Sequence, residues 1–327
     1  MTTHSPSGPH AIPLDEVRER SGRLMAAMNS VIEGKAGVVQ TVVSALLAEG
    51  HLLIEDVPGV GKTLLAKTLA RAIDCSVRRI QFTPDVLPSD VSGVSIFNQE
   101  TRGFEFRPGA IFANVVIGDE INRASPKTQS ALLEAMEENQ VTVDGITYPL
   151  PNPFLVMATQ NPIEMEGTHP LAEAQRDRFT ARLAIGYPSA AAEVEMLDGH
   201  AGTSPLEHLA PVTDAADIVA MIASVREVYA APAIKHYIVD LASATRSHRA
   251  VRLGASPRAA LHLLRMGRAH AALAGRDHVL PDDLHAIAEP VLAHRLILTG
   301  EAHAARTTAA DIIAELLATV RVPATVS

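Results

Sequence analysis

The pattern of hydrophobic and polar residues changes character partway along the chain. Up to about residue 190, short apolar runs alternate with segments whose apolar residues recur at helical spacing. Short apolar runs bounded by polar residues are typical of buried strands, and they cover residues 51–56, 76–82, 114–120, 154–161 and 182–188. Helical spacing extends over residues 63–74 and 125–140. This alternation predicts an open, mostly parallel α/β sheet.

Two segments between the expected strands have the pattern of β-hairpins instead. Residues 93–109 carry alternating apolar residues on either side of a polar, glycine-containing turn. Residues 140–150 turn at Asp144-Gly145, a dipeptide suited to a two-residue turn with positive φ. We therefore expect two hairpins outside the main sheet.

The pattern after about residue 190 is helical throughout. Segments rich in Ala and Leu follow one another, with helix starts predicted at Asp214, Ser256-Pro257 and Pro281. At the other end, the first residues are rich in Ser, Pro, Thr and His, which is typical of a disordered lead-in. The expected organisation is a disordered tail over residues 1–20, an α/β core domain over 21–190 and an all-α domain over 191–327.

Composition and charge exclude several classes of protein. A formal net charge of −9 argues against a protein held on nucleic acid by bulk electrostatics. The single cysteine, Cys75, can form neither a disulfide framework nor a thiolate metal site within one chain. No apolar stretch reaches the roughly 18 uninterrupted residues that a membrane-spanning helix needs, and the first residues lack the apolar core of a signal peptide. We expect a cytoplasmic protein without a membrane or nucleic-acid partner.

A glycine-rich segment with the sequence EDVPGVGKT, Glu55–Thr63, follows the first expected strand and opens the first expected helix. Its end matches the phosphate-binding pattern G-x-x-x-x-G-K-S/T, in the strand–loop–helix context that the pattern requires. Asp56 stands where the pattern has its first glycine. We expect the turn at Pro58-Gly59, together with the tolerance of Asp for left-handed backbone geometry, to accommodate this exception.

We expect this loop to bind ATP, because backbone amides at the positive end of a helix can surround a phosphate group. Lys62 would reach the β- and γ-phosphates, and the Thr63 hydroxyl would ligate Mg²⁺. GTP is excluded as the preferred nucleotide, since the chain has no N/T-K-x-D segment to read guanine. The expected nucleotide-binding residues of the loop are Pro58, Gly59, Val60, Gly61, Lys62, Thr63 and Leu64.

Two carboxylates and an amide follow neighbouring strands. Asp119 and Glu120 end the run VVIGDE, and a strand that ends in two carboxylates near a phosphate loop suits metal-assisted hydrolysis. We expect Asp119 to position Mg²⁺ and Glu120 to act as general base on the attacking water. Asn161 ends the next strand, where its amide is expected to orient that water beside the γ-phosphate.

Three arginines are candidates for contact with the phosphates. Arg176 and Arg178 precede the last strand of the core and, in a doubly wound sheet, face away from the chain's own nucleotide. One of them is therefore expected to enter a neighbour's site as an arginine finger. Arg258 lies in the first turn of a helix in the second domain, from which we expect it to touch the γ-phosphate and report nucleotide state to that domain.

Five segments taken together resemble the MoxR family of AAA+ ATPases: EDVPGVGKT, QFTPDVLPSDVSG, GDEINRASPKTQSALLEAMEENQVTVDG, ATQNPIEMEGTHPLAEAQRDRF and GASPRAA. The resemblance covers about residues 23–300. It implies an αβα core with a parallel sheet and a phosphate loop, followed by a helical lid. It also implies a hexameric ring that hydrolyses ATP with Mg²⁺. The resemblance further implies that Asn161 is the first sensor, Arg178 the finger and Arg258 the second sensor.

The same resemblance implies an adenine pocket that begins at Val31, Ile32 and Gly34. It further implies chaperone-like work on a protein client, such as assembly of an enzyme complex or insertion of a metal or cofactor. The implied partner is a protein that carries a von Willebrand factor A domain.

Two other functions are open at this point. A nucleic-acid motor, such as a helicase-type ring, could use the same core. However, residues 140–150 contain no Lys or Arg, and aromatic residues make up only 3% of the chain, so base-stacking platforms would be scarce. The other alternative is a nucleotide switch without hydrolysis, against which Glu120 and Asn161 together favour turnover. We therefore favour protein remodelling over both.

Overall fold

The computed structural model describes residues 10–57, 59–161, 168–187 and 205–322. At its centre is a five-stranded parallel sheet in the order β2-β5-β8-β1-β9. The strands are β1 (Leu52–Glu55), β2 (Val77–Gln81), β5 (Val115–Asp119), β8 (Leu155–Gln160) and β9 (Ala181–Leu183). The parallel sheet predicted from the sequence is confirmed, although its last strand ends at Leu183 instead of continuing to residue 188.

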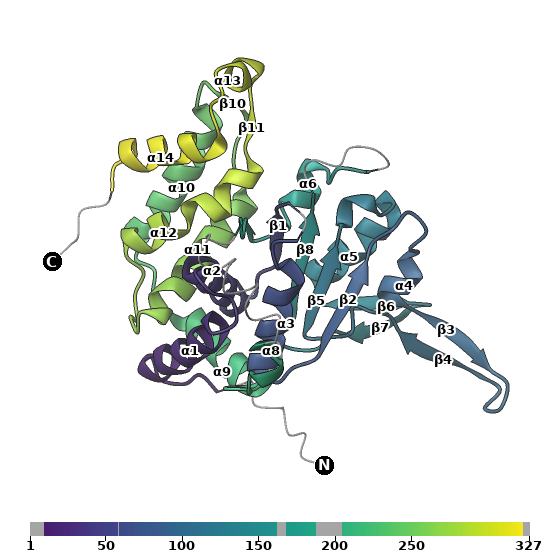
Figure 1. The fold of residues 1–327 in the computed structure, drawn as a ribbon. Helices are drawn as coiled ribbons and strands as arrows, with labels where there is room; N and C mark the ends of the chain where they lie inside the picture. The colour runs from purple at the N-terminus through teal and green to yellow at the C-terminus, as the bar shows by residue number, and fades with distance from the viewer. Residues whose placement is uncertain (1–9, 58, 162–167, 188–204, 323–327) are drawn as a thin grey trace, which may run out of the picture.

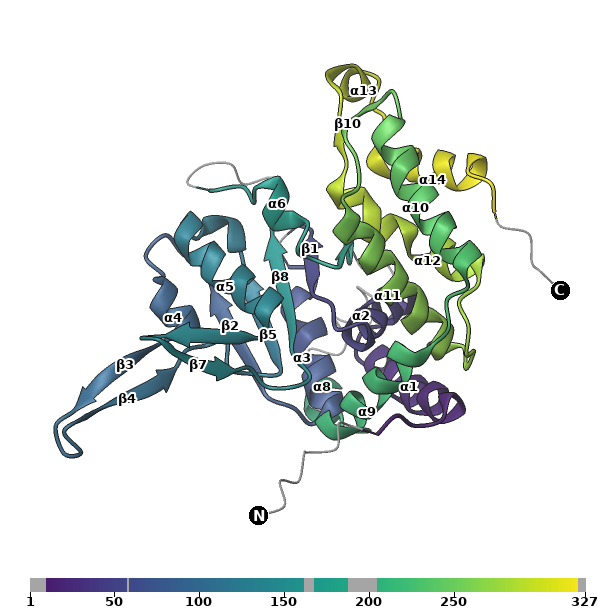
Figure 2. The ribbon, with the colours of Figure 1, turned by 180° about the vertical axis from the view of Figure 1, so that it is seen from behind.

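Helices cover both faces of this sheet, as Figures 1 and 2 show. Their bounds are α2 (Ala36–Leu47), α3 (Lys62–Ile73), α4 (Pro88–Ser92) and α5 (Pro126–Glu138). α2 and α3 share one buried cluster with β1, and α4 and α5 share a second with β2 and with the other faces of β5 and β8. Because β5 and β8 are buried on both faces, their sequences are apolar runs without alternation.

Both expected hairpins are present as separate two-stranded antiparallel sheets. Their strands are β3 (Gly93–Asn98) with β4 (Gly103–Pro108), and β6 (Gln140–Val143) with β7 (Ile146–Pro149). At the second turn, Asp144 and Gly145 have φ of 50° and 78°, as the dipeptide predicts. Figure 1 shows the β3–β4 hairpin extending away from the rest of the molecule.

The C-terminal part is a helical lid. Its helices are α8 (Pro205–His208), α9 (Ala215–Glu227), α10 (Pro232–Ser247), α11 (Pro257–Leu273), α12 (Pro281–Leu292), α13 (Gly300–Ala304) and α14 (Ala309–Thr319). Asp214 and Ser256 cap α9 and α11, where the sequence predicts helix starts. The lid is not purely helical, however, because β10 (Val251–Leu253) and β11 (Ile297–Leu298) form a small antiparallel sheet. Strands this short give almost no periodic signal in a sequence.

The expected disordered tail over residues 1–20 requires a correction. α1 (Leu14–Asn29) begins inside that range, and it buries Val17, Ser21, Leu24 and Met28, which recur at helical spacing. The polar residues between them masked this stripe in the sequence. Residues 1–9 lie outside the described part of the chain, as does the expected domain boundary at 190–191.

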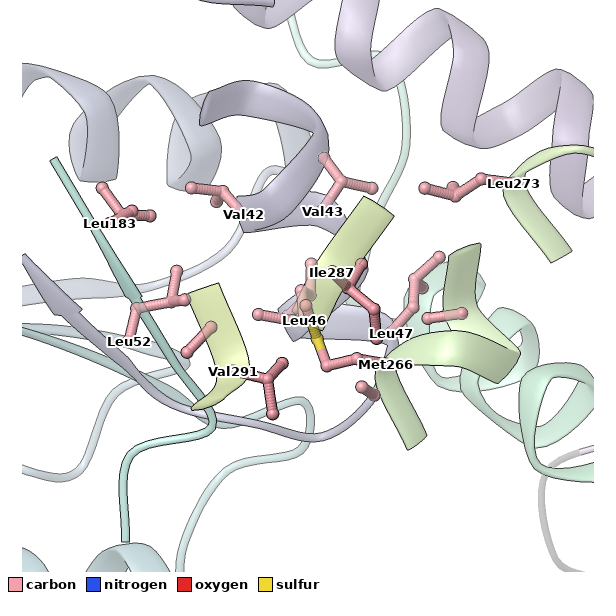
Figure 3. Packing of buried hydrophobic residues seen from close by; sticks show 14 of the residues in the cluster. Val42, Val43, Leu46, Leu47, Leu52, Leu183, Met266, Leu273, Ile287 and Val291 are labelled. Atoms are coloured by element: carbon pink, nitrogen blue, oxygen red, sulfur yellow. The ribbon is translucent and has the colours of Figure 1, made fainter. Parts of the chain in front are cut away.

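A single apolar cluster joins the core to the lid. Figure 3 shows Val42, Val43, Leu46 and Leu47 of α2 between the sheet and the lid helices. The labelled residues around them are Leu52 of β1, Leu183 of β9, Met266 and Leu273 of α11, and Ile287 and Val291 of α12. The lid therefore packs on α2 as well as on its own helices. Among the described residues, no helix combines the length and apolar character needed to cross a membrane.

Candidate active site

The phosphate loop connects β1 to α3. Gly59 and Gly61 have φ of 84° and 91°, in the left-handed region that favours glycine, and Gly61 is the N-cap of α3. The loop therefore ends at the first turn of a helix, where backbone N–H groups are unused within the helix and can bind an anion. Val60 is buried and Leu64 packs against the core. Pro58 lies outside the described residues.

Asp56 ties this loop to the segment that follows β9. Its Oδ2 accepts hydrogen bonds from the backbone N–H groups of Ile185 and Gly186, at 2.7 and 2.6 Å, and Oδ1 accepts one from Val57 at 2.8 Å. The backbone of Asp56 does not have a positive φ, so the left-handed geometry expected to accommodate it is not used. Asp56 has a structural role that a glycine could not perform.

Lys62 opens α3, and its ammonium group lies beside the backbone of the loop. Nζ donates a hydrogen bond to the carbonyl oxygen of Asp56 at 2.5 Å. Burial lowers the pKa of Lys62, while the carboxylates of Asp56, Asp119 and Glu120 act in the opposite direction. Lys62 is thus close enough to the carboxylates at the end of β5 to interact with them electrostatically.

Asp119 ends β5, is only 6% exposed and lies at the centre of a hydrogen-bond network. Its Oδ2 accepts hydrogen bonds from Thr63 Oγ1 at 3.3 Å and from Arg79 Nε at 2.6 Å. Its Oδ1 accepts one from Thr159 Oγ1 at 3.3 Å. The hydroxyl of Thr63 and the carboxylate of Asp119, the two groups expected to hold Mg²⁺, are therefore in direct contact.

Glu120 has φ 58° and ψ 49°, a left-handed conformation that is uncommon for a residue with a side chain. Its backbone N–H donates to Thr159 Oγ1 at 3.0 Å. Its Oε2 accepts hydrogen bonds from Gln81 Nε2 and Arg123 Nη1, both at 3.1 Å. The side chain is 35% exposed, so water can reach the carboxylate. Uncommon backbone geometry of this kind is concentrated at functional sites.

Asn161 comes to the same edge of the sheet through the parallel register. It follows β8, which lies between β5 and β1, and it is 7% exposed. Gln160 of β8 pairs with Glu55, the last residue of β1, and Ala158 pairs with Gly118 of β5. The carboxyl ends of three adjacent strands thus bring the phosphate loop, the Asp119-Glu120 pair and Asn161 together.

The residues implied for the adenine pocket lie in the connection between α1 and α2: Val31, Ile32 and Gly34. Ile32 is buried in the main core and Val31 packs against it, whereas Gly34 is exposed with φ 69°. The next residue, Lys35, donates a hydrogen bond from Nζ to the carbonyl oxygen of Tyr187 at 2.9 Å. Tyr187 follows Gly186, whose backbone N–H donates a hydrogen bond to Asp56. The connection between α1 and α2 and the phosphate loop therefore both contact the segment after β9.

The arginine candidates lie at the amino ends of the strands, whereas the phosphate loop lies at their carboxyl ends. Thr180, directly before β9, donates its backbone N–H to the carbonyl oxygen of His51, directly before β1, at 2.8 Å. Arg178 is two residues earlier, and therefore at the amino ends of the strands, whereas the phosphate loop follows the carboxyl end of β1. Strand β1 by itself spans about 13 Å between these edges.

Arg178 and Arg258 meet at one carboxylate. Glu137, in the last turn of α5, forms ion pairs with Arg178 at 3.3 Å and with Arg258. All three residues line a pocket of about 340 Å³. Arg176, the other finger candidate, ends α6 (Glu173–Arg176), and its Nε is buried without a hydrogen-bond partner. Arg258 therefore lies beside Arg178, at the amino ends of the strands, and not beside Lys62 at the carboxyl ends.

The sequence did not single out several residues that contact these groups, among them Arg79, Gln81 and Glu137. Arg79 and Gln81 lie on one face of the edge strand β2, and Arg79 Nη2 donates a hydrogen bond to Gln81 Oε1 at 2.8 Å. Together they link Asp119 to Glu120 through a continuous chain of hydrogen bonds. The alternation in VRRIQ could have revealed this polar face. Glu137 gave no signal, because exposed carboxylates are common on helices.

Two family models match the chain, one in the core and one in the lid. The model described as "ATPase family associated with various cellular activities (AAA)" matches residues 51–181. The model described as "AAA lid domain" matches residues 243–316. The first range contains the sheet and the phosphate loop, and the second contains most of the lid helices.

Curated relatives match most of the chain. Chaperone MoxR1 of Mycobacterium tuberculosis is 40% identical over 92% of this chain and 82% of its own length. Protein MoxR of Paracoccus denitrificans is 32% identical over 84% of this chain and 87% of its own length. YeaC of Bacillus subtilis, an uncharacterized protein, is 50% identical over 92% of this chain and 94% of its own length.

Two solved structures have a similar fold. A candidate ATPase from Cytophaga hutchinsonii is 37% identical, with a TM-score of 0.88 over 95% of this chain and 97% of that one. A full-length MCM homolog from Methanopyrus kandleri covers 91% of this chain and 64% of that one, with a TM-score of 0.58 at 19% identity, and shares the fold alone. The chain belongs to the MoxR family of AAA+ ATPases, as its motifs predict.

Proposed function

We propose that this protein is an ATP-hydrolysing chaperone of the MoxR type, which works as a ring and remodels a protein client. One observation carries the hydrolytic part: Thr63 Oγ1 lies 3.3 Å from Asp119 Oδ2, at the edge of the sheet where the phosphate loop ends and Glu120 follows. The name of the relative from Mycobacterium tuberculosis, Chaperone MoxR1, supports the chaperone part.

The residues at this edge fit a magnesium ion. Mg²⁺ prefers oxygen ligands and is usually held by one or two protein groups together with substrate phosphates and water. Thr63 and Asp119 supply one hydroxyl and one carboxylate, 3.3 Å apart. In the proposed reaction these two groups would hold the ion, whose chemistry there would be to polarise the γ-phosphate and to offset charge on the leaving group.

The chain's own residues would then divide the remaining work. Lys62 would bind the β- and γ-phosphates from the start of α3. Glu120 would accept a proton from the attacking water while the water oxygen bonds to the γ-phosphorus and the bond to the β–γ bridging oxygen breaks. Asn161 would orient that water. Gln81 and Arg123, which bind Glu120 at 3.1 Å, would hold its carboxylate in position.

Hydrolysis in this proposal requires a neighbouring copy. Arg178 and Arg258 lie at the edge of the sheet opposite Lys62, so they are poorly placed for the nucleotide of their own chain. We infer that both reach the nucleotide of the next copy, as arginine fingers do. A closed ring, hexameric by the family resemblance, would supply these arginines at every interface.

The proposed partners are a protein client and a protein with a von Willebrand factor A domain, in the cytoplasm. The β6–β7 hairpin supports a protein client, because it carries no Lys or Arg that could bind a nucleic-acid backbone. Affinity purification of a Glu120→Gln variant in the presence of ATP should recover both partners. Tight, salt-sensitive binding of DNA or RNA by the purified protein would overturn this part of the proposal.

We predict that Glu120→Gln binds ATP and keeps the ring assembled but loses hydrolysis. The amide preserves the shape of the side chain but cannot accept the proton of the attacking water. Steady-state phosphate release should fall about 100-fold or more. Equilibrium binding of a fluorescent ATP analogue and the sedimentation profile should match the parent protein. Turnover equal to that of the parent would show that Glu120 is not the base.

A further inference from the structure

We propose that Glu137 is a positioning residue that holds Arg178 of the core and Arg258 of the lid as one two-arginine unit for the neighbour's phosphates. The inference rests on the proposed function, in which both arginines act across the interface between copies. Glu137 itself would not touch the nucleotide. It would fix the distance and orientation of the two guanidinium groups that do.

The geometry at Glu137 is that of a shared counter-charge. Oε2 pairs with Arg178 Nη1 at 3.3 Å, and Oε1 pairs with Arg258 Nη2, so each carboxylate oxygen binds one guanidinium group. Arg178 Nη1 also donates a hydrogen bond to the carbonyl oxygen of Leu133 at 2.8 Å. An arginine has five N–H donors, so both side chains keep donors for a further anion. They are 32% and 36% exposed, which leaves them accessible to a neighbouring copy.

A second carboxylate holds the chain segments that carry these arginines. Asp177, the residue before Arg178, accepts hydrogen bonds from the Ser256 hydroxyl at 2.9 and 2.8 Å. Ser256 caps α11, in which Arg258 occupies the first turn. Arg295 of the lid, buried with 6% exposure, binds the Asp177 carboxylate at 2.8 Å. The start of α11 is therefore fixed against the finger segment, and Glu137 binds the two guanidinium groups that this arrangement brings together.

The surroundings favour an anion over any other ligand. The pocket of about 340 Å³ is lined by four arginines and two glutamates, namely Arg178, Arg226, Arg258, Arg265, Glu49 and Glu137. Glu49 is already engaged by Arg226, at 2.7 and 2.5 Å. Burial, followed by the nearby positive charges of Arg295 and Arg265, lowers the pKa of His262 in this pocket to about 2. A phosphate group is the complementary ligand.

Removal of the shared counter-charge should separate the two arginines. Two guanidinium groups close to each other repel, and Glu137 offsets that repulsion. Glu137→Gln keeps the size of the side chain but removes the charge. We expect kcat of the assembled ring to fall about 10-fold or more, because small displacements of catalytic groups lower rates strongly. Nucleotide affinity of the isolated protomer should be unchanged, since its own phosphate loop is at the other edge of the sheet.

Controls separate this role from a structural one. Glu138→Gln removes the adjacent exposed charge on α5 and should leave kcat and the melting temperature unchanged. Glu137→Asp keeps the charge and should recover part of the lost rate. Because Glu137 acts through Arg178 and Arg258 together, the loss of rate in the double variant Glu137→Gln/Arg258→Ala should be smaller than the sum of the losses in the two single variants. Additive losses, or a lower melting temperature that explains the loss, would overturn the inference.

Arg178→Ala distinguishes failure of this inference from failure of the proposed function. If Arg178→Ala keeps the ATPase activity of the ring, the finger assignment is wrong and the role of Glu137 falls with it. If Arg178→Ala abolishes activity while Glu137→Gln equals the parent protein, only the role of Glu137 is wrong. A rise in ATPase activity of Glu137→Gln would also contradict the inference, because Glu137 would then restrain the arginines instead of positioning them.

Discussion

Asp56 occupies the first position of the phosphate-loop pattern, where glycine is usual. Its carboxylate accepts three backbone hydrogen bonds, two of them from the segment after β9. That segment also borders the connection between α1 and α2 through Lys35 and Tyr187. One side chain therefore links the phosphate loop to the region where the family resemblance implies adenine binding. Its role depends on the side chain and not on an unusual backbone conformation.

We predict that Asp56→Gly weakens ATP binding, although it restores the general pattern. The change removes the acceptor for the N–H groups of Ile185 and Gly186, and a hydrogen bond to a charged group is worth about 1.5–3 kcal/mol. The free energy of unfolding, measured by urea titration, should fall by about 1–3 kcal/mol. ATP affinity, measured by fluorescence titration, should fall several-fold.

The control for this change is Asp56→Asn, which keeps one acceptor oxygen and should give an intermediate result. If Asp56→Gly bound ATP much more tightly than the parent protein, the loop would be strained by Asp56, and the stabilising role of its carboxylate would be wrong.

At the scale of secondary structure, the lid is held together by a buried carboxylate between two helices. Asp283, in the first turn of α12, accepts hydrogen bonds on Oδ2 from Arg276 Nη1 and from the backbone N–H of Leu280, both at 2.7 Å. His270 Nδ1 of α11 lies 2.8 Å from the other oxygen. Burial alone would raise the pKa of Asp283, but the hydrogen bonds from Arg276 and His270 outweigh it and lower the pKa to about 2.

This pKa predicts the pH dependence of lid stability. Because the pKa is lower in the folded protein than in the unfolded chain, the stabilisation is complete above about pH 4 and is lost as the pH falls towards 2. Asp283→Asn should lower the unfolding free energy by about 2 kcal/mol at pH 7, from about 1.4 kcal/mol per pKa unit. The difference from the parent protein should shrink between pH 4 and pH 2.

Urea titrations at a series of pH values measure this difference. Asp282→Asn, at the exposed neighbouring position, is the matched control and should follow the parent protein at every pH. A gap between Asp283→Asn and the parent that stays constant down to pH 2 would mean that Asp283 is not held as a charged group.

The elements that the sequence predicts well are those with strong local signals. The apolar runs of β5 and β8 and the glycines before Lys62 are such signals, and they predict the sheet and the phosphate loop. The short strands β10 and β11 and the amphipathic stripe of α1 depend on tertiary packing, and they were missed.

The contacts of the candidate site also divide into those that local sequence patterns predict and those that depend on tertiary packing. Motif spacing singles out Asp119 and Glu120 because both follow one strand. It cannot show that Arg79 binds Asp119, or that Glu137 joins Arg178 to Arg258. These partners are distant in the sequence and meet only when the strands and the lid pack. Charged residues on exposed surfaces are too common for a single sequence to distinguish those with such a role.

At the scale of the whole molecule, the main feature is that the candidate catalytic groups lie at both ends of the strands of the sheet. Lys62, Thr63, Asp119 and Glu120 lie at the carboxyl edge, and Arg178 lies at the amino edge. In the proposed function, a single chain therefore carries the two halves of a site at opposite ends of the strands. Contact between successive copies would bring one half of each chain against the other half of its neighbour, a head-to-tail contact that forms a ring when the rotation between copies closes.

The most direct test of this account mixes two inactive proteins. Glu120→Gln lacks the base but keeps the finger, and Arg178→Ala lacks the finger but keeps the base. Each should be inactive when alone. When the two are co-expressed, some interfaces combine an intact Glu120 with an intact Arg178, and ATPase activity should return. As the control, a chain that carries both substitutions should not restore activity to either variant. Absence of recovery at every mixing ratio, or full activity of Arg178→Ala alone, would contradict a site shared between copies.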